Sequence, residues 1–440
     1  MKPAMLWKKS LFLFISLLLA TSLFLQGAAY SEAAETPVDS KSFIQEQSPQ
    51  TLPYISKQIP TTSDQLVQVI VQLSSQPAAI GRYAATQGIS DLSSETAELT
   101  VQAEQTSFIA AAYKKGIDFT INYMYNTVLN GMEITLPASQ VLTLAALPDV
   151  KSIHENHTYY PISNDVLSPN FDIAPLSQIG ETDAWAQGLT GKGLKIGVLD
   201  TGIDYNHPDL IGSYKGGYDS FNNDSDPFED LPSSASDDPL HGASYEGSYH
   251  GTHVAGTIIG QAVNHTSDIV QRGVTFKAEL YAYKVLGKTY IPDSNGSGSY
   301  KNSGSSAQVI DGIERAVKDG MDVINLSLGS DITKDVNSLD AIAINNAVLA
   351  GVAAVVTSGN GGPEYHMMSS PATAQLGISV GATDTSSEAV TFSPEAELTH
   401  AQLAAMLVHA LGMFQPSAST TREAAASVIY SLLKQANLSN

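Results

Sequence analysis

The sequence of 440 residues contains no cysteine, which excludes a disulfide framework and any metal site built from thiolates. Basic residues are also scarce, because 22 lysines and arginines stand against 44 aspartates and glutamates. The net charge of −22 argues against nucleic acid as a partner, since such binding depends on neutralising phosphates with Lys and Arg. With 43% hydrophobic and only 15% charged residues, the composition instead predicts a globular protein with a sizeable packed core.

Long apolar runs are missing as well, with one exception at the N-terminus. Lys8 and Lys9 precede an apolar run at residues 11–25, and small residues follow at 27–29. A positive start, an apolar centre and a small-residue end are typical of a secretory signal peptide, predicted here over residues 1–29. A signal anchor is the alternative, although the run is short for a membrane span. We therefore expect a secreted protein that has no transmembrane segment once the signal is removed.

Residues 30–63 are polar and without a sustained period, so they are predicted to be a linker. A small α+β domain is predicted over residues 64–160, where strand and helix patterns alternate. Its elements are expected in this order: a strand at 66–73, a helix at 95–115, a hairpin within 117–136 that turns near Asn130-Gly131, a short helix at 139–147 and a strand at 150–160. This order is that of a split βαβ domain.

Strand and helix patterns alternate again over residues 178–383, and glycines close the helices. This alternation predicts an α/β domain with a doubly wound parallel sheet and helices on both faces. Ligands of such sheets bind beyond the carboxyl ends of the strands. The site is expected to include three marked positions that end or follow strands, namely Asp200, Ser327-Leu328-Gly329 and Asn360.

Three phrases along this domain carry a family resemblance. Asp200 stands in DTGIDYNHPDL, His250 in HGTHVAGT and Asn360 in TSGNGG. In this order they resemble the subtilisin-like serine proteases, most of all the large secreted members of bacilli, over residues 176–392. The resemblance implies a subtilisin-like doubly wound sheet and peptide-bond hydrolysis by an Asp-His-Ser triad, which requires no cofactor. Residues 64–160 are similar to the inhibitor-type prodomain of that family.

The resemblance implies a role for each marked residue. His250 would be the general base, and Asp200 would fix the tautomer of its imidazole and stabilise the imidazolium. Asn360 would donate a hydrogen bond to the oxyanion. Ser327-Leu328-Gly329 would form an edge to which a polypeptide substrate adds as a strand. The C-terminal tail of the prodomain would lie in the same cleft until it is cut.

Two other chemistries compete for the same residues. The triplet at 200–202 also fits the aspartic proteases, but that chemistry needs a second carboxylate, and the similar run at 384–386 has serine in place of glycine. His250 and His253 have the i, i+3 spacing of helical metal ligands, but no glutamate of the zincin pattern follows. We therefore expect His253 to be a packed, hydrogen-bonded histidine of the core.

No Lys or Arg occurs between Lys215 and Arg272, while acidic residues are frequent there. The interval is predicted to be a solvated acidic loop. A structural calcium site with oxygen ligands is the alternative, although no EF-hand spacing supports it. The acidic residues concerned include Asp219, Asp224, Asp226, Glu229, Asp230, Asp237, Asp238 and Glu246.

The nucleophile of the triad is not visible in the sequence. The Gly-Thr-Ser-x-Ala-x-Pro element that carries it in the family does not occur after Gly381, and neither Ser393 nor Ser417 has such surroundings. A triad without a nucleophile cannot form a covalent intermediate. We therefore expect a peptidase domain that is incomplete at its C-terminal end, and a chain that is inactive or very weakly active. The alternatives are a wall-associated peptide-binding pseudoprotease and a nonfunctional deletion remnant.

Residues 393–440 carry a second resemblance. FSPEAELTHAQLAAMLVHALGM and TTREAAASVIYSLL are similar to S-layer-homology repeats, which anchor proteins to the walls of Gram-positive bacteria. This resemblance implies a cell-wall polymer as a partner and a location at the wall. Apolar residues of the first phrase fall on one face of a helix, so a short tail of amphipathic helices without a ligand is the alternative. The two resemblances meet near Phe392, where a deletion would have joined them.

Overall fold

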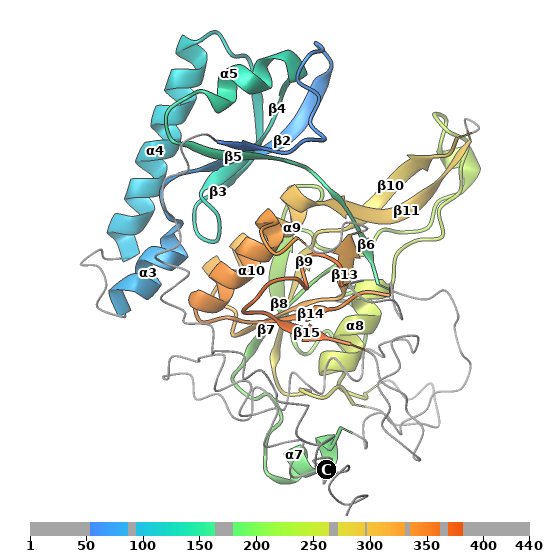
Figure 1. The fold of residues 1–440 in the computed structure, drawn as a ribbon. Helices are drawn as coiled ribbons and strands as arrows, with labels where there is room; N and C mark the ends of the chain where they lie inside the picture. Colours follow the sequence, from blue (N-terminus) through green and yellow to red (C-terminus); the bar gives the residue numbers. More distant parts are fainter. Residues whose placement is uncertain are drawn as a thin grey trace, which may run out of the picture. The chain divides into compact units, whose positions relative to one another are not determined.

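A computed structural model describes residues 53–86, 94–162, 179–263, 272–294, 297–330, 335–360 and 368–381. The predicted signal peptide at 1–29 and the predicted C-terminal helices at 393–440 lie outside these residues, as does most of the predicted linker. No helix within the described ranges is long and apolar enough to cross a membrane. The described chain forms three sheets, which Figure 1 shows together with the helices that cover them.

The first sheet corresponds to the predicted small α+β domain and has the strand order β1-β5-β2-β4-β3. Its strands are β1 Tyr54–Ile55, β2 Leu66–Leu73, β3 Thr120–Tyr125, β4 Gly131–Pro137 and β5 Val150–Glu155. The helices of this part are α3 Ala78–Thr86, α4 Ser94–Lys114 and α5 Val141–Ala145, with a 3-10 turn η1 at Ala138–Gln140. Val69, Phe108 and Ile134 belong to the core that these elements share. Strand β1 lies within the stretch predicted as linker, because two residues are too few to show a period.

The predicted hairpin near Asn130-Gly131 joins β3 and β4, which pair antiparallel. Glycine is required at this turn, because a Cβ atom on Gly131 would lie 2.1 Å from the Val71 carbonyl oxygen of strand β2. Only a residue without a side chain lets the two backbones approach so closely.

The second sheet has six parallel strands in the order β15-β14-β12-β7-β9-β8. They are β7 Lys195–Asp200, β8 Tyr214–Asp219, β9 Glu279–Lys284, β12 Val323–Leu326, β14 Ala353–Thr357 and β15 Ile378–Val380. The helices of this part are α7 Glu181–Ala186, α8 His250–Ile259, α9 Ser306–Lys318 and α10 Leu339–Leu349, with a 3-10 turn η2 at Ala235–Asp237. The predicted doubly wound parallel sheet is confirmed.

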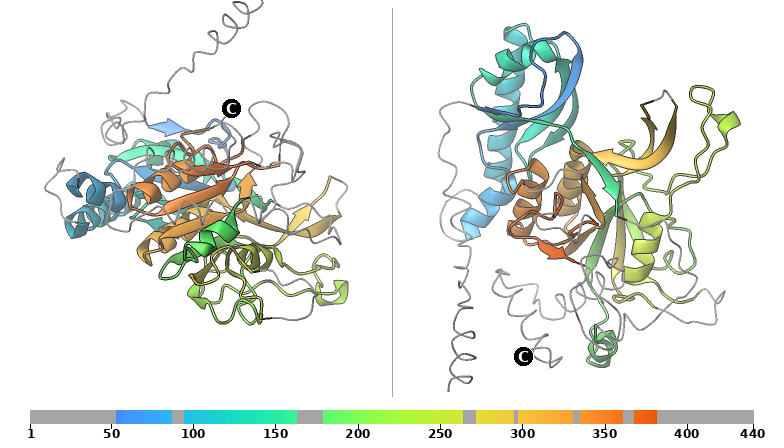
Figure 2. Two further views of the ribbon diagram at one scale, coloured as in Figure 1. Left: turned by 90° about the horizontal axis from the view of Figure 1, so that it is seen from below. Right: turned by 45° about the vertical axis from the view of Figure 1, so that its right-hand side comes forward.

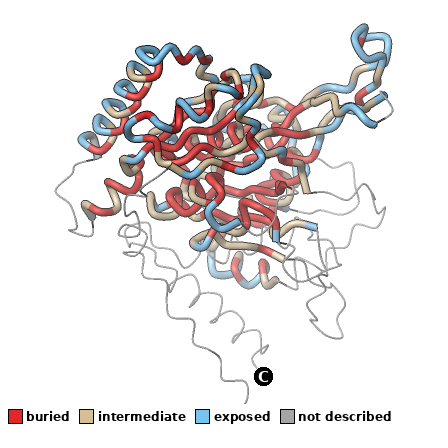
Figure 3. The backbone as a smooth tube through the Cα atoms, turned by 45° about the horizontal axis from the view of Figure 1, so that its top comes forward, coloured by how far each residue is buried: buried red, intermediate tan, exposed pale blue. Residues whose placement is uncertain are grey.

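Helices cover both faces of this parallel sheet. Leu199 shares a hydrophobic cluster with Ile313 of α9 and Ile344 of α10, while its neighbour Val198 belongs to a second cluster with Val254 of α8. Adjacent residues of a strand point to opposite faces, so a short continuous apolar strand such as β7 can pack against helices on both sides. Figure 3 shows the resulting buried stretches in the strands and in the helices that face them.

The third sheet is antiparallel, with the order β10-β11-β6-β13, and it joins the two other parts. Its strands are β6 Thr158–Pro161, β10 Gly287–Pro292, β11 Gly298–Ser305 and β13 Leu328–Ser330. In Figure 1 and the right-hand view of Figure 2 the β10–β11 hairpin projects away from the helices of the parallel sheet.

The single strand predicted at 150–160 is two strands, β5 and β6, which belong to different sheets. The residues between them are bound to the start of α9. Asn156 Oδ1 accepts a hydrogen bond from the Ala307 amide at 3.0 Å, and the His157 amide donates to Ser306 Oγ at 3.2 Å. These contacts redirect the chain from the first sheet to the third.

The first sheet also contacts α9 and α10 directly. The Glu314 carboxylate accepts hydrogen bonds from the three backbone amides of residues 126–128 at 2.7–3.0 Å. Asn346 Nδ2 donates to the Val128 carbonyl oxygen at 2.7 Å, and the Tyr125 hydroxyl donates to the Ala307 carbonyl oxygen at 3.1 Å. The loop between β3 and β4 is therefore anchored on two helices of the parallel-sheet part.

Candidate active site

Asp200 and His250, which are predicted to be partners, meet at the carboxyl end of β7. Asp200 is the last residue of that strand, and His250 is the first residue of α8. His250 Nδ1 lies 2.6 Å from Asp200 Oδ1, and both side chains are buried. A carboxylate in this position fixes the imidazole tautomer and leaves Nε2 available to take up a proton.

Gly251 lets the start of α8 pack closely against the end of β7. A Cβ atom on Gly251 would lie 2.1 Å from the Gly202 carbonyl oxygen and 3.0 Å from Asp200 Cβ. The Gly251 amide donates to Thr201 Oγ1 at 2.9 Å, so the residue after Asp200 satisfies one free amide of the helix end. The phrases around Asp200 and His250 thus have a structural reason as well as a chemical one.

A buried glutamate supports the same helix end. Glu229 Oε1 accepts hydrogen bonds from the Thr252 amide at 2.9 Å and from Thr252 Oγ1 at 3.0 Å, and Oε2 accepts one from Ser248 Oγ. A negative charge at the first turn of a helix is stabilising, because the free amides there carry partial positive charge. Burial raises the pKa of Glu229, although its hydrogen bonds with Ser248 and Thr252 act in the opposite direction. Sequence reasoning assigned Glu229 to the acidic loop and did not identify this role.

The pKa of His250 is raised above its usual value of 6.5. Burial acts against the charged imidazolium, but the charge of Asp200 and the hydrogen bond to it outweigh that cost. The Ile162 carbonyl and the charge of Glu229 raise the pKa further. The environment therefore favours a protonated His250, which is the form that a general base reaches during proton transfer.

The second ring nitrogen of His250 faces residues 158–162, which we call the tail. His250 Nε2 lies 3.1 Å from the Ile162 carbonyl oxygen, although the two residues are 88 positions apart. The Ile162 amide donates to the Ser327 carbonyl oxygen at 2.9 Å. Strand β6 of the tail runs antiparallel to β13, so that Tyr160 lies opposite Gly329.

Two residues of the predicted edge, Leu328 and Gly329, lie in β13, and the Ser327 carbonyl oxygen precedes that strand. Strand β13 is paired with the chain's own tail, which also pairs on its other side with β11 through Gly304 and Ser305. Binding of a substrate at this edge stays a prediction. An extended segment held between two strands is bound chiefly by its backbone, as in peptide recognition by strand addition.

Asn360 is exposed and follows the end of β14 by three residues. It stands beyond the carboxyl end of a strand in the same parallel sheet as β7, on the side where the Asp–His pair lies. Its hydrogen bond to an oxyanion stays a prediction.

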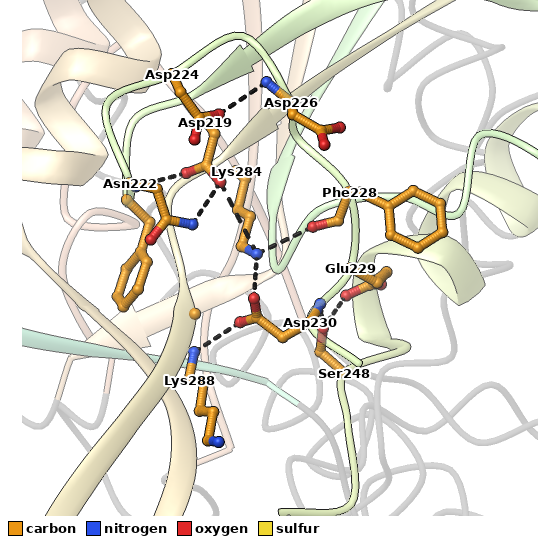
Figure 4. A network of polar contacts seen from close by, with 12 residues as sticks. Asp219, Asn222, Asp224, Asp226, Phe228, Glu229, Asp230, Ser248, Lys284 and Lys288 are labelled. Atoms are coloured by element: carbon orange, nitrogen blue, oxygen red, sulfur yellow. Dashed lines mark hydrogen bonds and ion pairs between the residues drawn. The ribbon is translucent and has the colours of Figure 1, made fainter. Parts of the chain in front are cut away.

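The interval between Lys215 and Arg272 differs from the solvated loop that its composition predicts. Asp219 and Glu229 are buried, and so is Lys284 of β9, which is only 2% exposed. Lys284 Nζ lies 2.6 Å from Asp230 Oδ1 and 3.9 Å from Asp219 Oδ2 (Figure 4). The prediction is wrong for these residues, because Lys284, which pairs with Asp219 and Asp230, comes from a distant part of the sequence, and Glu229 is bound to the start of α8.

These carboxylates do not fit the calcium alternative. Asp219 accepts hydrogen bonds from the amide and the side chain of Asn222, and Asp230 accepts from Lys284 Nζ and the Lys288 amide (Figure 4). Within the described ranges no three His, Asp or Glu residues are grouped so that they could hold a metal ion. The oxygens of this network are used by protein donors.

His253 does not lie in the core, where the sequence predicts it. It is exposed on α8, whereas its neighbour Val254 faces the sheet. The expectation of a packed core histidine is wrong, because the buried face of α8 is formed by Val254, Ala255, Ile258 and Ile259.

Comparison with known sequences decides the family. The sequence model of the Subtilase family matches residues 191–427. The chain belongs to the subtilase family. The sequence model named Peptidase inhibitor I9 matches residues 68–161, so the subtilisin-like α/β fold is preceded by an inhibitor-type prodomain. The subtilase match continues into the segment that resembles S-layer-homology repeats.

Two curated proteases show how much of a subtilase the chain covers. It is 38% identical to the minor extracellular protease Vpr of Bacillus subtilis (strain 168) over 338 residues, which are 74% of the chain and 37% of that protein. It is 33% identical to subtilisin E of the same strain over 267 residues, which are 60% of the chain and 59% of that protein. The chain thus spans less than two thirds of the length of either relative. Among solved structures, fervidolysin from Fervidobacterium pennivorans, a keratinolytic enzyme related to subtilisin, matches with a TM-score of 0.44 and 19% identity, over 76% of this chain and 47% of that one.

Proposed function

We propose that the chain carries the prodomain and the acid–base pair of a secreted serine endopeptidase. In this proposal His250 is the general base, Asp200 orients it and Asn360 donates a hydrogen bond to the oxyanion. The substrate is a polypeptide that adds as a strand to Ser327-Leu328-Gly329. The chemistry requires no cofactor. Membership of the subtilase family and the 2.6 Å contact within the Asp–His pair support the proposal.

The observation that carries the proposal is the position of the tail relative to this pair. The tail is bound as a strand, and its last described carbonyl, that of Ile162, faces His250 Nε2 at 3.1 Å. A peptide held in this way presents the bond that follows Ile162 to the base. We therefore assign the bond between Ile162 and Ser163 as the processing site of the prodomain.

Hydrolysis also needs a nucleophile, and the sequence contains no Gly-Thr-Ser element. We infer that the 440-residue chain cuts peptides very weakly or not at all, because the residual catalysis of a triad without its serine comes only from binding and the oxyanion donors. The tail then stays attached. The paired tail favours a second function for the chain, the binding of peptides at the β13 edge without turnover.

Secretion is supported by the apolar run at 11–25 behind Lys8 and Lys9, and by a relative that is named an extracellular protease. Association with the cell wall is supported only by the resemblance of residues 393–440 to S-layer-homology repeats. Binding of the secreted chain to purified walls, with and without residues 393–440, tests the wall partner separately from the chemistry.

Intact mass of the secreted protein tests the processing site. An uncut chain that binds peptides without hydrolysing casein supports the binding function. Cleavage after Ile162 in the wild type but not in His250→Ala, together with casein hydrolysis that a serine-directed inhibitor blocks, supports an active enzyme and overturns the inferred inactivity. Neither binding nor turnover in a poorly folded chain indicates a deletion remnant.

A further inference from the structure

One side chain of the tail is completely buried. Tyr159 is 0% exposed and is among the largest fully buried side chains of the described residues. Its neighbours differ, because Thr158 is exposed and Tyr160 is half-buried. On strand β6, Tyr159 lies opposite Gly304 of β11 on one side and Ser330 of β13 on the other.

The site that surrounds Tyr159 is apolar except where its hydroxyl ends. Tyr159 belongs to the same hydrophobic cluster as Leu328 and Leu339. Its hydroxyl donates a hydrogen bond to the carboxylate of Asp340, which is 1% exposed and lies in the first turn of α10. We call this set, completed by Ser370, the Tyr159 site.

Two serines hold the carboxylate in place. Ser370 Oγ donates to Asp340 Oδ2 at 2.6 Å, and Ser338 Oγ lies 2.7 Å from Ser370 Oγ. Both serines are buried. Asp340 is thus oriented by residues of the parallel-sheet part, and the phenol of the tail supplies one further donor.

The donor, Tyr159, and the acceptor, Asp340, lie on segments of which only one is replaceable. Asp340, Ser338 and Ser370 are fixed in the body of the protein, whereas Tyr159 lies on the segment that a substrate strand would replace. A substrate must therefore fill the same volume and face the same carboxylate. A phenylalanine would fill the volume but would remove the phenol donor, so that the buried Asp340 carboxylate would be left with the donor of Ser370. Such a loss costs more than the loss of an exposed hydrogen bond.

We propose that the Tyr159 site makes this chain selective for tyrosine at the fourth residue before the bond presented to His250, with Asp340 as the specificity-determining residue. The inference rests on the proposed binding of peptides at the β13 edge and names the class of peptide bound there. Thr158–Pro161 with the following isoleucine, Thr-Tyr-Tyr-Pro-Ile, is the example that the chain itself provides.

Hydrogen exchange of the tail in the full chain tests the proposal, followed by mass spectrometry of a fragment that contains residues 158–162. In Tyr159→Phe we expect the tail amides to exchange about tenfold to a hundredfold faster than in the wild type, as for the loss of a hydrogen bond to a charged group. Tyr160→Phe is the matched control, because it removes the same hydroxyl from the adjacent, half-buried tyrosine. We expect that control to change tail exchange by less than about threefold.

A change at Asp340 should remove the preference. In Asp340→Leu, the tail with Tyr159→Phe should exchange about as fast as the tail with tyrosine, because the phenol loses the carboxylate and keeps only the hydroxyls of Ser370 and Ser330 as hydrogen-bond partners. Asp340→Asn keeps an acceptor oxygen and should retain a weaker preference for tyrosine. Exchange of the α9 and α10 amides reports whether each variant is folded. If Asp340→Leu is not folded, the exchange of the tail in Asp340→Asn tests the role of Asp340.

The outcomes separate this inference from the proposed function. Unprotected tail amides in the wild type would overturn the binding of the tail at the β13 edge, and the proposed function with it. A protected tail in which Tyr159→Phe and Tyr160→Phe behave alike would overturn only the tyrosine selectivity. A preference for tyrosine that persists in Asp340→Leu would also overturn the role of Asp340.

Discussion

Two of the contacts between the prodomain and the parallel-sheet part are built differently. On the face of its sheet, side chains hold a loop, since Glu314 accepts from the three amides of 126–128 and Asn346 donates to Val128. At its tail, backbone pairing with β11 and β13 holds a strand, and Tyr159 is its one fully buried side chain.

The side-chain contact at residues 126–128 anchors the prodomain, whereas the backbone pairing of the tail fills the β13 edge. The face contact makes no use of the strand edge beside His250, so it persists whatever peptide lies there. The tail contact uses backbone groups that any extended peptide possesses, which makes the tail replaceable. The same prodomain can therefore remain bound while the β13 edge changes its occupant.

Breaking the face contact should have the largest effect. Glu314 is 1% exposed, and Glu314→Ala leaves three amides of 126–128 without an acceptor. Each buried unsatisfied donor costs about 1–3 kcal/mol, so we expect the free energy of unfolding to fall by about 4 kcal/mol in urea denaturation. Glu314→Gln keeps one acceptor oxygen and should lose about half as much. Wild-type stability in Glu314→Ala would show that this face does not anchor the prodomain.

Acidification should weaken the prodomain through His154 of β5. Burial lowers the pKa of His154 from 6.5 to about 4, although the charge of Asp335 opposes the shift. Because the folded-state pKa is below the unfolded value, the stabilisation is complete above pH 6.5 and is lost as the pH falls towards 4. The loss is about 3 kcal/mol, since a pKa difference of one corresponds to about 1.4 kcal/mol. Denaturation at several pH values should show a shallower dependence in His154→Gln, and equal slopes in both proteins would contradict the assignment.

His250, which faces the tail, should change the stability with pH in the direction opposite to His154. The pKa of His250 is raised, so its charged form contributes stability below pH 6.5, and this contribution is lost as the pH rises through the folded-state pKa. In Asp200→Asn, burial should dominate and bring the pKa of His250 below 6.5, as measured by NMR titration of the ring. A raised pKa that survives in Asp200→Asn would show that Asp200 is not its main cause.

The smallest effect is expected at Glu229. The charge of Glu229 raises the pKa of His250 less than the charge of Asp200 does, so Glu229→Gln should lower that pKa by less than Asp200→Asn does. The glutamine oxygen still accepts from the Thr252 amide, which keeps the end of α8 in place. The same NMR titration measures the difference, and an unchanged pKa would limit Glu229 to a structural role at the helix.

Regular patterns in the sequence were sufficient for most of the fold. Alternation of apolar residues located β2 at Leu66–Leu73, and glycine stops separated the helices of the parallel sheet from its strands. The split of 150–160 into β5 and β6 was not predictable in this way, because no glycine or proline interrupts the run between the two strands. What turns the chain there is its binding to Ser306 and Ala307, about 150 residues later.

The buried acids could not be found from the sequence either. Glu229, Asp219 and Asp340 have the same residue type as solvated neighbours, and a sequence does not state burial. Glu229 is buried because α8 begins beside it, and Asp219 because Lys284 of β9 pairs with it. Asp340 matters because Tyr159, 181 positions earlier, donates to it.

The sequence by itself determined which residue types stand at the strand ends, since the phrases around Asp200 and His250 need glycine and threonine at fixed offsets to bring the helix start onto the strand. Only the tertiary structure decided what those residues face. The direction of His250 Nε2 towards Ile162, the register of the tail on β13 and the donor to Asp340 all join segments separated by 88 to 181 positions. Local patterns fix local geometry, whereas contacts of that range exist only after the sheets have formed and the two parts have packed together.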